Sequence, residues 1–457
     1  MKGSVHIVGI GGAGMSAIAK VLVGRGQKVT GSDQNQSIYT ESLEALGVEV
    51  QIGHRESNLV DAGIVLASSA VPDGNVELTE ARKRGIPVMR RREFWHELLS
   101  GKRTVAVAGT HGKTTTTGLI AWMLDHAGRE PSFIVGGLLM DFDTNARAGE
   151  GDVFVVEADE YDRAFHGMDP EIAVITNVEH DHPDSYPTFD SFKQAFETFA
   201  RSATGTVILC EDDPVAAAMP VQDAQRVGYG LTGASDWSAA DIRPNSAGGS
   251  DFLVLRSGET LGLVRSRLLG RHNVQNALAA FAAVDVLDLE FNEAREALTQ
   301  YRGVRRRFEV IGERAGITVV DDYAHHPTEI VATLQSARER YPQGNLWAVF
   351  QPHTYSRLKA LEEAFREAFG SADRVLVMDV FAARETTNSV ISGEMIAANI
   401  DHPNVRYSGD IAQTVDLLGR GVMAGDVVIT LSAGDGNQVG RLLLEKIKAS
   451  EGETDHG

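Results

Sequence analysis

The 457-residue sequence is too long for one compact core and favours about three domains. Hydrophobic residues at 43 % and charged residues at 23 % are typical of a soluble globular protein. The 43 basic and 63 acidic residues leave a net charge of -20, which repels nucleic acid and anionic membranes. A nucleic-acid partner is therefore not expected. No stretch approaches the roughly 18 apolar residues of a membrane helix, so membrane insertion is not expected either.

The single cysteine, Cys210, excludes an intramolecular disulfide and a multi-cysteine metal site. Its apolar neighbours indicate a buried strand residue. Glycines interrupt the apolar N-terminal segment, which lacks a cleavage-like end and is therefore expected to belong to the mature fold instead of a signal peptide. The cytoplasm is the compartment that we expect.

Residues 1–102 are predicted to form a first α/β domain. The runs at 5–10 and 28–32 are typical of strands, and residues 14–25 between them have a helical pattern. Strands that alternate with helices at this spacing predict a parallel, doubly wound sheet.

A second α/β domain is predicted over residues 103–307 and a third over 308–457. Strands of the second are expected at 104–108, 153–156, 173–176 and 207–209, and residues 241–264 alternate as in a small antiparallel layer. Strands of the third are expected at 318–320, 346–350, 374–378 and 426–431, with helices between them.

A glycine-rich turn, Gly9-Ile10-Gly11-Gly12-Ala13-Gly14, follows the first predicted strand. Such a turn brings backbone N–H groups against an anionic group at a helix N-terminus. Asp33 ends the second strand, where a carboxylate can accept hydrogen bonds from a nucleotide. These residues leave three interpretations open: a nicotinamide or flavin dinucleotide, another diphosphate-containing ligand, or a turn without a ligand.

A phosphate-binding loop is predicted where the strand at 104–108 runs into Gly109-Thr110-His111-Gly112-Lys113-Thr114-Thr115 and a helix. Backbone N–H groups and the helix dipole are expected to hold the β-phosphate of a nucleotide, while Lys113 neutralises the β and γ charges. The Thr114 hydroxyl is a suitable ligand for Mg²⁺. Val107 stands where the usual first glycine of this motif lies, so the motif is a shortened variant.

Two clusters of possible metal ligands follow the next two predicted strands. The first is Glu157-Ala158-Asp159-Glu160-Tyr161-Asp162 and the second is Glu179-His180-Asp181-His182. Because strand ends can converge at one edge of a parallel sheet, both clusters are expected near the phosphate loop. Carboxylate oxygens favour Mg²⁺, although His180 and His182 leave zinc as an alternative.

Taken in order, these motifs resemble those of the Mur ligases, which extend the cell-wall peptide on a UDP-sugar. The resemblance covers nearly the whole chain. It implies a Rossmann-like N-terminal domain that binds the UDP-sugar, a P-loop central ATPase domain with a mostly parallel sheet, and a Rossmann-like C-terminal domain that binds the amino acid.

The resemblance also implies residue roles. The UDP-sugar would be bound by Gly11, Gly12, Ala13, Ser32, Asp33, Ser68, Ser69, His111, Arg306 and Arg307. ATP would be bound by Gly109, Thr110, His111, Gly112, Lys113, Thr114, Thr115, His272, Asn273, Asn276 and Asp322. Mg²⁺ would be held by Thr114, Glu157 and His182, and the expected catalytic residues are Lys113, Glu157, His182 and His325.

Two segments of the third domain carry the resemblance further. The run from Asp321 to Glu329 resembles the family's Asp-Asp-Tyr-Gly-His-His-Pro-Thr-Glu, and Gln351 to Arg357 resembles Gln-Pro-His-Arg-Tyr-(Thr/Ser)-Arg of the members that add L-alanine. The resemblance therefore implies that Tyr323, His325 and Arg357 border the amino acid, with Arg357 pairing with its carboxylate.

Two positions depart from the alanine-adding pattern. Thr354 replaces the first arginine of the second segment, and Tyr161 stands where serine is usual. The run from Glu157 to Asp162 is more similar to the ligase that returns a murein tripeptide to UDP-N-acetylmuramate, so this activity is kept as an alternative. Members that add the second, third or fourth peptide unit usually carry a lysine where His182 stands, so the resemblance does not favour those activities.

The implied reaction forms an amide bond between UDP-N-acetylmuramate and L-alanine. The muramyl carboxylate would attack the γ-phosphate of ATP, and the amine would displace phosphate from the resulting acyl phosphate. His325 is the candidate general base. Two other classes stay open: an NAD-dependent dehydrogenase would use the first domain alone, and a regulatory P-loop ATPase the second alone.

Overall fold

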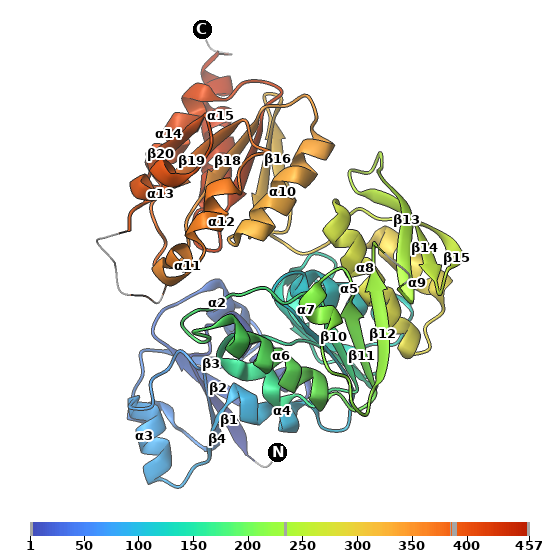
Figure 1. Ribbon diagram of the computed structural model, residues 1–457. Helices are drawn as coiled ribbons and strands as arrows, with labels where there is room; N and C mark the ends of the chain where they lie inside the picture. The colour runs from blue at the N-terminus through green and yellow to red at the C-terminus, as the bar shows by residue number, and fades with distance from the viewer. Residues whose placement is uncertain (1–2, 233–234, 384, 386–390, 455–457) are drawn as a thin grey trace. The chain divides into compact units, whose positions relative to one another are not determined.

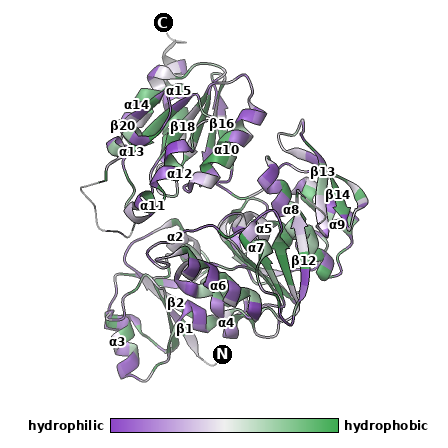
Figure 2. Ribbon diagram, viewed as in Figure 1, coloured by the Kyte–Doolittle hydropathy of each residue, from purple (hydrophilic) through white to green (hydrophobic). Residues whose placement is uncertain are grey.

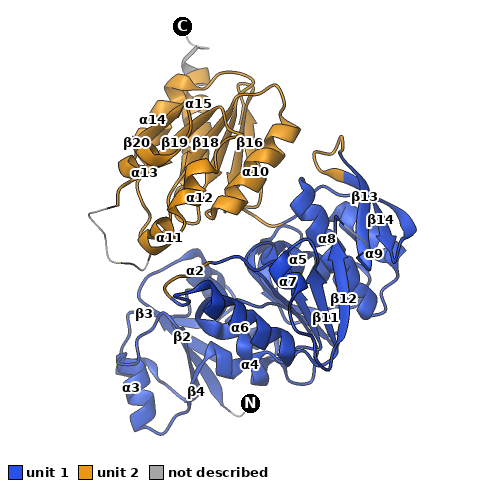
Figure 3. Cartoon of the chain, in the orientation of Figure 1, with its two compact units in different colours: residues 1–180, 185–243, 251–303 blue, residues 181–184, 244–250, 304–457 orange. Residues whose placement is uncertain are grey.

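The computed structural model describes residues 3–232, 235–383, 385 and 391–454 (Figure 1). The chain divides into two compact units (Figure 3). The first contains residues 1–180, 185–243 and 251–303, and the second contains residues 181–184, 244–250 and 304–457. Three sheets give the chain a three-domain α/β architecture, as predicted; the domain boundaries 1–102, 103–307 and 308–457 stay predictions.

The first sheet has the strand order β3-β2-β1-β4-β5, and its recorded pairs are all parallel. Its strands are β1 Ser4–Val8, β2 Val29–Asp33, β3 Glu49–Ile52, β4 Ala62–Ala67 and β5 Val88–Arg90. Its helical segments are α1 Ala13–Gly24, α2 Ile38–Glu44, η1 Glu56–Asn58, α3 Val76–Lys83 and α4 Arg91–Leu99. The strand order reverses direction at β1, so the glycine-rich turn after β1 lies at a topological switch point.

The second sheet has the order β15-β14-β13-β12-β11-β10-β6-β9-β7-β8. Its strands are β6 Arg103–Ala108, β7 Ser132–Leu139, β8 Thr144–Arg147, β9 Val153–Glu157, β10 Ile172–Ile175, β11 Thr206–Cys210, β12 Gln225–Gly230, β13 Trp237–Pro244, β14 Ser250–Arg256 and β15 Glu259–Arg265. Its helical segments are α5 Lys113–His126, η2 Tyr161–Gly167, α6 Phe189–Ser202, α7 Pro214–Ala217, α8 Arg271–Val286 and α9 Phe291–Gln300.

The predicted antiparallel layer over residues 241–264 is only partly correct. Strands β14 and β15 do pair in antiparallel fashion. They continue the second sheet through β13, however, which pairs in parallel with β12, and so they do not form a layer of their own.

The third sheet has the order β16-β17-β21-β18-β19-β20, with β16 as an antiparallel edge strand. Its strands are β16 Glu309–Arg314, β17 Ile317–Asp322, β18 Leu346–Phe350, β19 Arg374–Met378, β20 Val405–Gly409 and β21 Val427–Leu431. Its helices are α10 Pro327–Arg340, α11 Tyr355–Ala360, α12 Glu362–Glu367, α13 Gly393–Asn399, α14 Ile411–Gly421 and α15 Gln438–Thr454. The Rossmann-like arrangement predicted for this part of the chain is confirmed.

Apolar burial explains why these segments form strands. The middle strands are continuous hydrophobic runs, as Figure 2 shows, because helices cover both faces of a parallel sheet. One hydrophobic cluster joins the first and second sheets, and two clusters flank the third. Cys210 is buried as predicted, and burial raises the pKa of its thiol to about 11. None of the helices in the described ranges is both long and apolar enough to span a membrane.

Asp322, the last residue of β17, is hydrogen-bonded to the residue that precedes β16. Its carboxylate accepts hydrogen bonds from the backbone N–H groups of Phe308 at 2.7 Å and Ala324 at 2.7 Å. The side chain is buried, and burial raises its pKa to about 6, although the charge of Arg307 opposes this shift. Between pH values equal to the ordinary pKa and about 6, Asp322 is therefore mostly protonated in the folded protein and mostly ionised in the unfolded chain.

The pKa of Asp322 predicts a pH dependence of stability. Below pH ~4 the group is protonated in both states; as the pH rises towards about 6 the unfolded chain ionises first, and the free energy of unfolding falls. Relative to Asp322→Asn, the wild type should lose roughly 2–3 kcal/mol between pH ~4 and ~7. Urea titrations of both proteins across this range measure the difference, and parallel pH curves would contradict the assignment.

Candidate functional site

The turn between β6 and α5 requires glycine at two positions. Gly109 has φ of 141° and Gly112 has φ of 82°, values that side chains rarely adopt. A Cβ atom on Gly109 would lie 1.8 Å from Oγ1 of Thr176, and one on Gly112 would lie 2.4 Å from Oδ1 of Asn276. The turn therefore brings its backbone N–H groups to the start of α5 without room for side chains, as a phosphate-binding loop requires.

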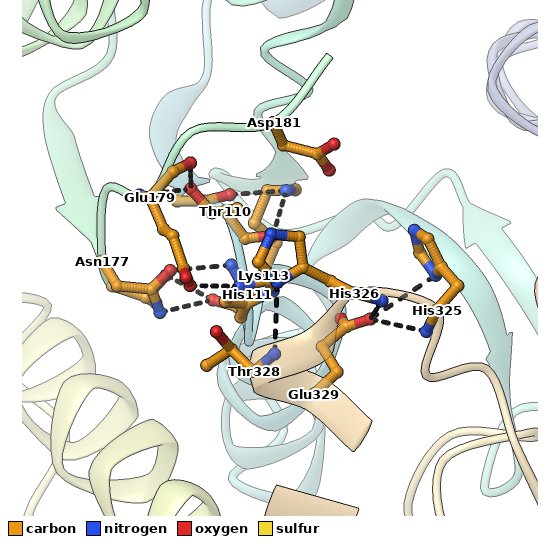
Figure 4. A network of polar contacts seen from close by, with 12 residues as sticks. Thr110, His111, Lys113, Asn177, Glu179, Asp181, His325, His326, Thr328 and Glu329 are labelled. Atoms are coloured by element: carbon orange, nitrogen blue, oxygen red, sulfur yellow. Dashed lines mark hydrogen bonds and ion pairs between the residues drawn. The ribbon is translucent and has the colours of Figure 1, made fainter. Parts of the chain in front are cut away.

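The segment after β10 holds this turn in place (Figure 4). The Thr176 hydroxyl donates to the His111 carbonyl at 2.6 Å, and the Asn177 side chain accepts from His111 N–H at 2.8 Å. Thr110 donates its N–H to the Asn177 carbonyl and its hydroxyl to the Glu179 carbonyl. Because β6 and β10 are neighbouring parallel strands, their carboxyl ends meet and these bonds become possible.

Lys113, the first residue of α5, is nearly surrounded by oxygen atoms. Its ammonium group donates to the carbonyls of Gly109 and Thr110 and to the carboxylate of Glu160 at 3.0 Å. Burial alone would lower the pKa of Lys113, but the negative charges of Glu160 and Glu157 raise it above its ordinary value. The ammonium therefore stays charged at the position where a nucleotide phosphate is expected.

Thr114 and Glu157 form a pair of oxygen donors beside Lys113. The Thr114 hydroxyl donates to Glu157 Oε1 at 3.1 Å, and Glu157 Oε2 accepts from the Gly136 N–H at 2.6 Å. Burial raises the pKa of Glu157, although the Lys113 charge opposes this. A hydroxyl and a carboxylate are hard oxygen ligands, so these two residues fit Mg²⁺, and a cation there would favour the ionised carboxylate.

His111 belongs to the same turn and faces the segment that follows β10. Its Nε2 is 3.0 Å from Oε2 of Glu179, so the imidazole and the carboxylate form a pair at the exit of β10. His111 is predicted to contact both ATP and the UDP-sugar. The structure places it beside the P-loop, and the assignment stays a prediction.

The predicted adenine-binding residues lie at the start of α8. Asn276 is buried, accepts a hydrogen bond from Thr116 of α5 at 3.3 Å and donates to Asn273 at 3.1 Å. Asn273 in turn donates to the Leu269 carbonyl and contacts His272. Since α8 packs against α5, the structure brings His272, Asn273 and Asn276 to the helix that begins at the P-loop, and Thr115 is also in that helix.

In the first domain, the glycine-rich turn is fixed by β2. The Ser32 carbonyl accepts from the N–H groups of Gly9 and Ile10, and Asp33 Oδ2 accepts from the Gly11 N–H at 2.9 Å. Gly12 caps α1 and Ala13 begins it. Ser68 and Ser69 follow β4, and the Ser68 N–H donates to the Val8 carbonyl at 3.0 Å. All seven residues predicted for the UDP-sugar in this domain thus lie at the carboxyl ends of neighbouring strands.

In the second unit, Arg306 and Arg307 flank the ring of Tyr323. The guanidinium carbons lie 5.1 Å and 5.4 Å from the ring centroid. Arg306 also pairs with Asp321 at 3.1 Å, and Arg307 contacts Glu329 at 3.4 Å. Arg306 is thus held by β17 and Arg307 by α10, and their role in binding the UDP-sugar stays a prediction.

His325 follows Tyr323 and is held by its neighbours (Figure 4). Its Nδ1 lies 2.9 Å from the Tyr323 carbonyl, and its N–H donates to Glu329 Oε2 at 3.2 Å. Burial and the positive charge of Arg357 lower the pKa of His325 to about 3. The imidazole is therefore neutral at physiological pH and is a weak proton acceptor.

Arg357 forms a bidentate ion pair inside the second unit. Its Nε and Nη2 donate to the two oxygens of Asp181 at 3.0 Å and 3.1 Å, and its Nη1 lies 3.0 Å from Nδ1 of His353. Arg357 is only 5 % exposed. Burial alone would raise the pKa of Asp181, but His182 and Arg357 hold that pKa well below its usual range.

The second cluster of possible metal ligands is divided in the structure. Glu179 and His180 belong to the first unit, whereas Asp181 and His182 belong to the second. His182 has φ of 53°, and its N–H donates to Asp181 Oδ1 at 2.7 Å. The predicted metal role of His182 and the zinc alternative stay predictions.

Three carboxylates have roles in the structure that the sequence pattern did not predict. Glu160 neutralises Lys113, Glu179 pairs with His111, and Asp181 pairs with Arg357. All three were part of the two acidic runs, which was the available signal. The pattern could not tell which member of a run faces which cation; Asp159, for example, pairs with Arg91 at 2.7 Å.

Comparisons with known proteins agree with this architecture. Residues 4–103 match the description "Mur ligase family, catalytic domain", residues 107–284 match "Mur ligase middle domain", and residues 306–434 match "Mur ligase, glutamate ligase domain". Together these matches extend over most of the chain.

Similar proteins span the same length. The UDP-N-acetylmuramate--L-alanine ligase of Roseiflexus castenholzii is 45 % identical, covering 96 % of this chain and 96 % of its own, and that of Rubrobacter xylanophilus is 43 % identical, covering 97 % and 100 %. A crystal structure of a UDP-N-acetylmuramate-alanine ligase from Thermotoga maritima has a TM-score of 0.84 at 29 % identity, covering 98 % and 100 %. A murein peptide ligase from Psychrobacter arcticus has a TM-score of 0.72 at 27 % identity, covering 97 % and 98 %. The chain belongs to the Mur ligase family.

Proposed function

We propose that this protein is an ATP-dependent ligase that joins L-alanine to UDP-N-acetylmuramate in the synthesis of peptidoglycan precursors. The observation that carries the proposal is the P-loop in which Lys113, Thr114 and Glu157 converge. Relatives named for this activity match the chain over nearly its full length. The substrates would be UDP-N-acetylmuramate, L-alanine and ATP, and the expected compartment is the cytoplasm, where ATP is available.

The chain's own residues suit phosphoryl transfer followed by acyl transfer. The muramyl carboxylate attacks the γ-phosphorus of ATP, the bond to ADP breaks, and an acyl phosphate forms. Lys113 and the N–H groups of the turn stabilise the charge on the transferred phosphoryl group. When bound by Thr114 and Glu157, with His182 as the further predicted ligand, Mg²⁺ would neutralise phosphate charge.

The second step joins the amino acid. The neutral amine of alanine attacks the acyl carbon, the bond from that carbon to the phosphate oxygen breaks, and inorganic phosphate leaves with the proton that the nitrogen loses. Arg357 is proposed to pair with the alanine carboxylate, and Tyr323 and His325 are proposed to border the amino group. Because its pKa is about 3, His325 is better suited to accepting a hydrogen bond from the amine than to removing its proton.

The second candidate function is the addition of a murein tripeptide to UDP-N-acetylmuramate, and Tyr161 is the residue that favours it. Tyr161, in the run that resembles the murein tripeptide ligase, begins η2, and its N–H donates to Asp159 at 3.0 Å. A solved murein peptide ligase also shares the fold. A panel of L-alanine, glycine, L-serine and the murein tripeptide in one assay distinguishes the two activities.

The ligase proposal predicts that phosphate release depends on both other substrates. With ATP present, release should be near background with UDP-N-acetylmuramate or L-alanine alone and should rise strongly when both are added, because the acyl phosphate is consumed only by the amine. Coupled phosphate assays measure the rate, and mass spectrometry identifies the amide. Release that ignores both substrates would support a regulatory ATPase, and saturable thermal stabilisation by NAD would support a dehydrogenase.

Lys113→Ala should reduce the rate of phosphoryl transfer by at least about a hundredfold, because a charged group aimed at the phosphate is lost. Calorimetric binding of UDP-N-acetylmuramate should change little, since the glycine-rich turn of the first domain is proposed to hold it. The double variant Lys113→Ala, Glu160→Gln is the control, because it removes the buried carboxylate that the single change leaves without its ammonium. Recovery of activity in the double variant would show that Lys113 has only a structural role.

Arg357→Lys should raise the KM for L-alanine roughly ten- to a hundredfold, because lysine cannot make a bidentate pair with a carboxylate. The KM for ATP should stay within about twofold. Steady-state kinetics with each substrate varied in turn measure both values.

The matched control for Arg357 is Lys359→Ala, an exposed cation two residues later in α11, which should leave all three KM values unchanged. An alanine KM within twofold of wild type in Arg357→Lys would mean that Arg357 serves only Asp181. Asp181→Asn then provides a second check, because it removes the competing carboxylate while it keeps the guanidinium.

A further inference from the structure

The first domain contains a buried carboxylate, Glu77, in the first turn of α3. Its side chain is 0 % exposed. One oxygen lies 3.1 Å from His6 Nε2 and accepts from the Ser32 hydroxyl at 2.6 Å. The other accepts from the Asn58 side chain at 2.6 Å and from the Arg55 N–H at 3.0 Å. Strands β1 and β2 and the segment after β3 therefore meet at one carboxylate.

These hydrogen bonds keep Glu77 ionised. Burial alone would raise its pKa, but the hydrogen bonds from His6, Ser32, Arg55 and Asn58 lower it to about 2. An ionised carboxylate can only accept hydrogen bonds, so every group around it must donate. This requirement fixes the direction of the hydrogen bonds in the network.

The direction of the hydrogen bond between His54 and Ser32 is fixed in the same way. The Ser32 hydroxyl has one proton, which it donates to Glu77, so its oxygen must accept from His54 Nδ1 at 2.9 Å. The His54 ring therefore carries a proton on Nδ1, which points at the Ser32 oxygen. The His54 side chain is 12 % exposed, whereas Glu77 is fully buried.

The network ends at the glycine-rich turn. The Ser32 carbonyl accepts from the N–H groups of Gly9 and Ile10, and the adjacent Asp33 accepts from Gly11. Ser32 thus connects the turn, through its backbone, with Glu77, through its side chain. A change in the Ser32 hydroxyl or in β2 would be transmitted to the residues proposed to bind the UDP-sugar.

We propose that Glu77 is a positioning residue for the UDP-sugar, which orients the Ser32 hydroxyl and sets the Nδ1–H tautomer of His54. This inference rests on the proposed function, because UDP-N-acetylmuramate is the ligand whose binding it controls. Glu77 does not touch the ligand; it acts through Ser32 and His54 at the carboxyl end of β2.

Glu77→Gln is the direct test. The amide would place an N–H₂ group against neighbours that must donate, so the Ser32 hydroxyl is expected to turn away and to donate to His54. The Kd of UDP-N-acetylmuramate, measured by calorimetry without ATP or alanine, should rise about ten- to a hundredfold. The KM for ATP and the kcat at saturating UDP-sugar should stay within about twofold.

Four tests separate positioning from a structural role. Glu77→Asp keeps the charge and should rescue much of the affinity, and Glu80→Gln in the same helix, which removes surface pairs with Lys83 and Arg84, should have no effect. In a Ser32→Ala background, Glu77→Gln should weaken binding less than it does in the wild type. Nitrogen-15 NMR of His54 should show protonated Nδ1 in the wild type and a mixture of tautomers in Glu77→Gln.

The outcomes are distinguishable. Failure of the wild type to bind UDP-N-acetylmuramate would overturn the proposed function, and the inference with it. Wild-type binding together with an unchanged Kd in folded Glu77→Gln would overturn the inference alone. If Glu77→Gln does not fold, Ser32→Ala carries the test, and unchanged affinity together with an unchanged His54 tautomer in that variant would also overturn it.

Discussion

The buried ammonium group of Lys113 sets the arrangement of the nucleotide site. Removing an ammonium ion from water costs several kcal/mol unless opposite charges and hydrogen bonds replace the solvent. The carbonyls of Gly109 and Thr110 and the carboxylates of Glu160 and Glu157 supply this replacement. The turn must therefore bend tightly around the lysine, and β9 must end in an acidic run beside it.

The order of the strands makes this arrangement possible. Strand β6 lies between β9 and β10 and is parallel to both, so three loops leave the same edge of the sheet. The loop after β6 provides the turn around the phosphate site, the end of β9 and the loop after it provide Glu157 and Glu160, and the loop after β10 provides Thr176 and Asn177. One topological fact thus brings together residues that are more than sixty positions apart in sequence.

Much of the fold follows from local patterns. The strands at 346–350 and 374–378 were predicted with their observed bounds, because each is a short apolar run bounded by polar residues. The P-loop and the glycine-rich turn were predictable for a similar reason, since tight turns at helix starts require glycine at particular positions. The β14–β15 hairpin was harder, because alternation along one strand does not reveal which sheet edge the strand extends.

The partners of the charged residues could not be predicted in the same way. Asp159 and Glu160 are neighbours in sequence, yet one pairs with Arg91 and the other with Lys113. The partner of Arg357, Asp181, is 176 positions away, and no local pattern connects them. Sequence therefore indicated which residue types gather at the site, whereas the pairing depends on side-chain directions that only the folded chain determines.

Thr354 shows how a departure from the family pattern is accommodated. It has φ of 60°, which is unfavourable for a β-branched residue by about 1–3 kcal/mol, and it caps α11 three residues before Arg357. Its N–H donates to the Phe381 carbonyl at 3.0 Å, and Glu385 accepts from the next two N–H groups, those of Tyr355 and Ser356. Threonine at this position cannot supply the charge of the arginine found in alanine-adding members. The local geometry is nevertheless retained, because the backbone contacts with Phe381 and Glu385 fix the start of the helix whatever side chain stands at position 354. The remaining cation, Arg357, is oriented in this chain by Asp181 and His353.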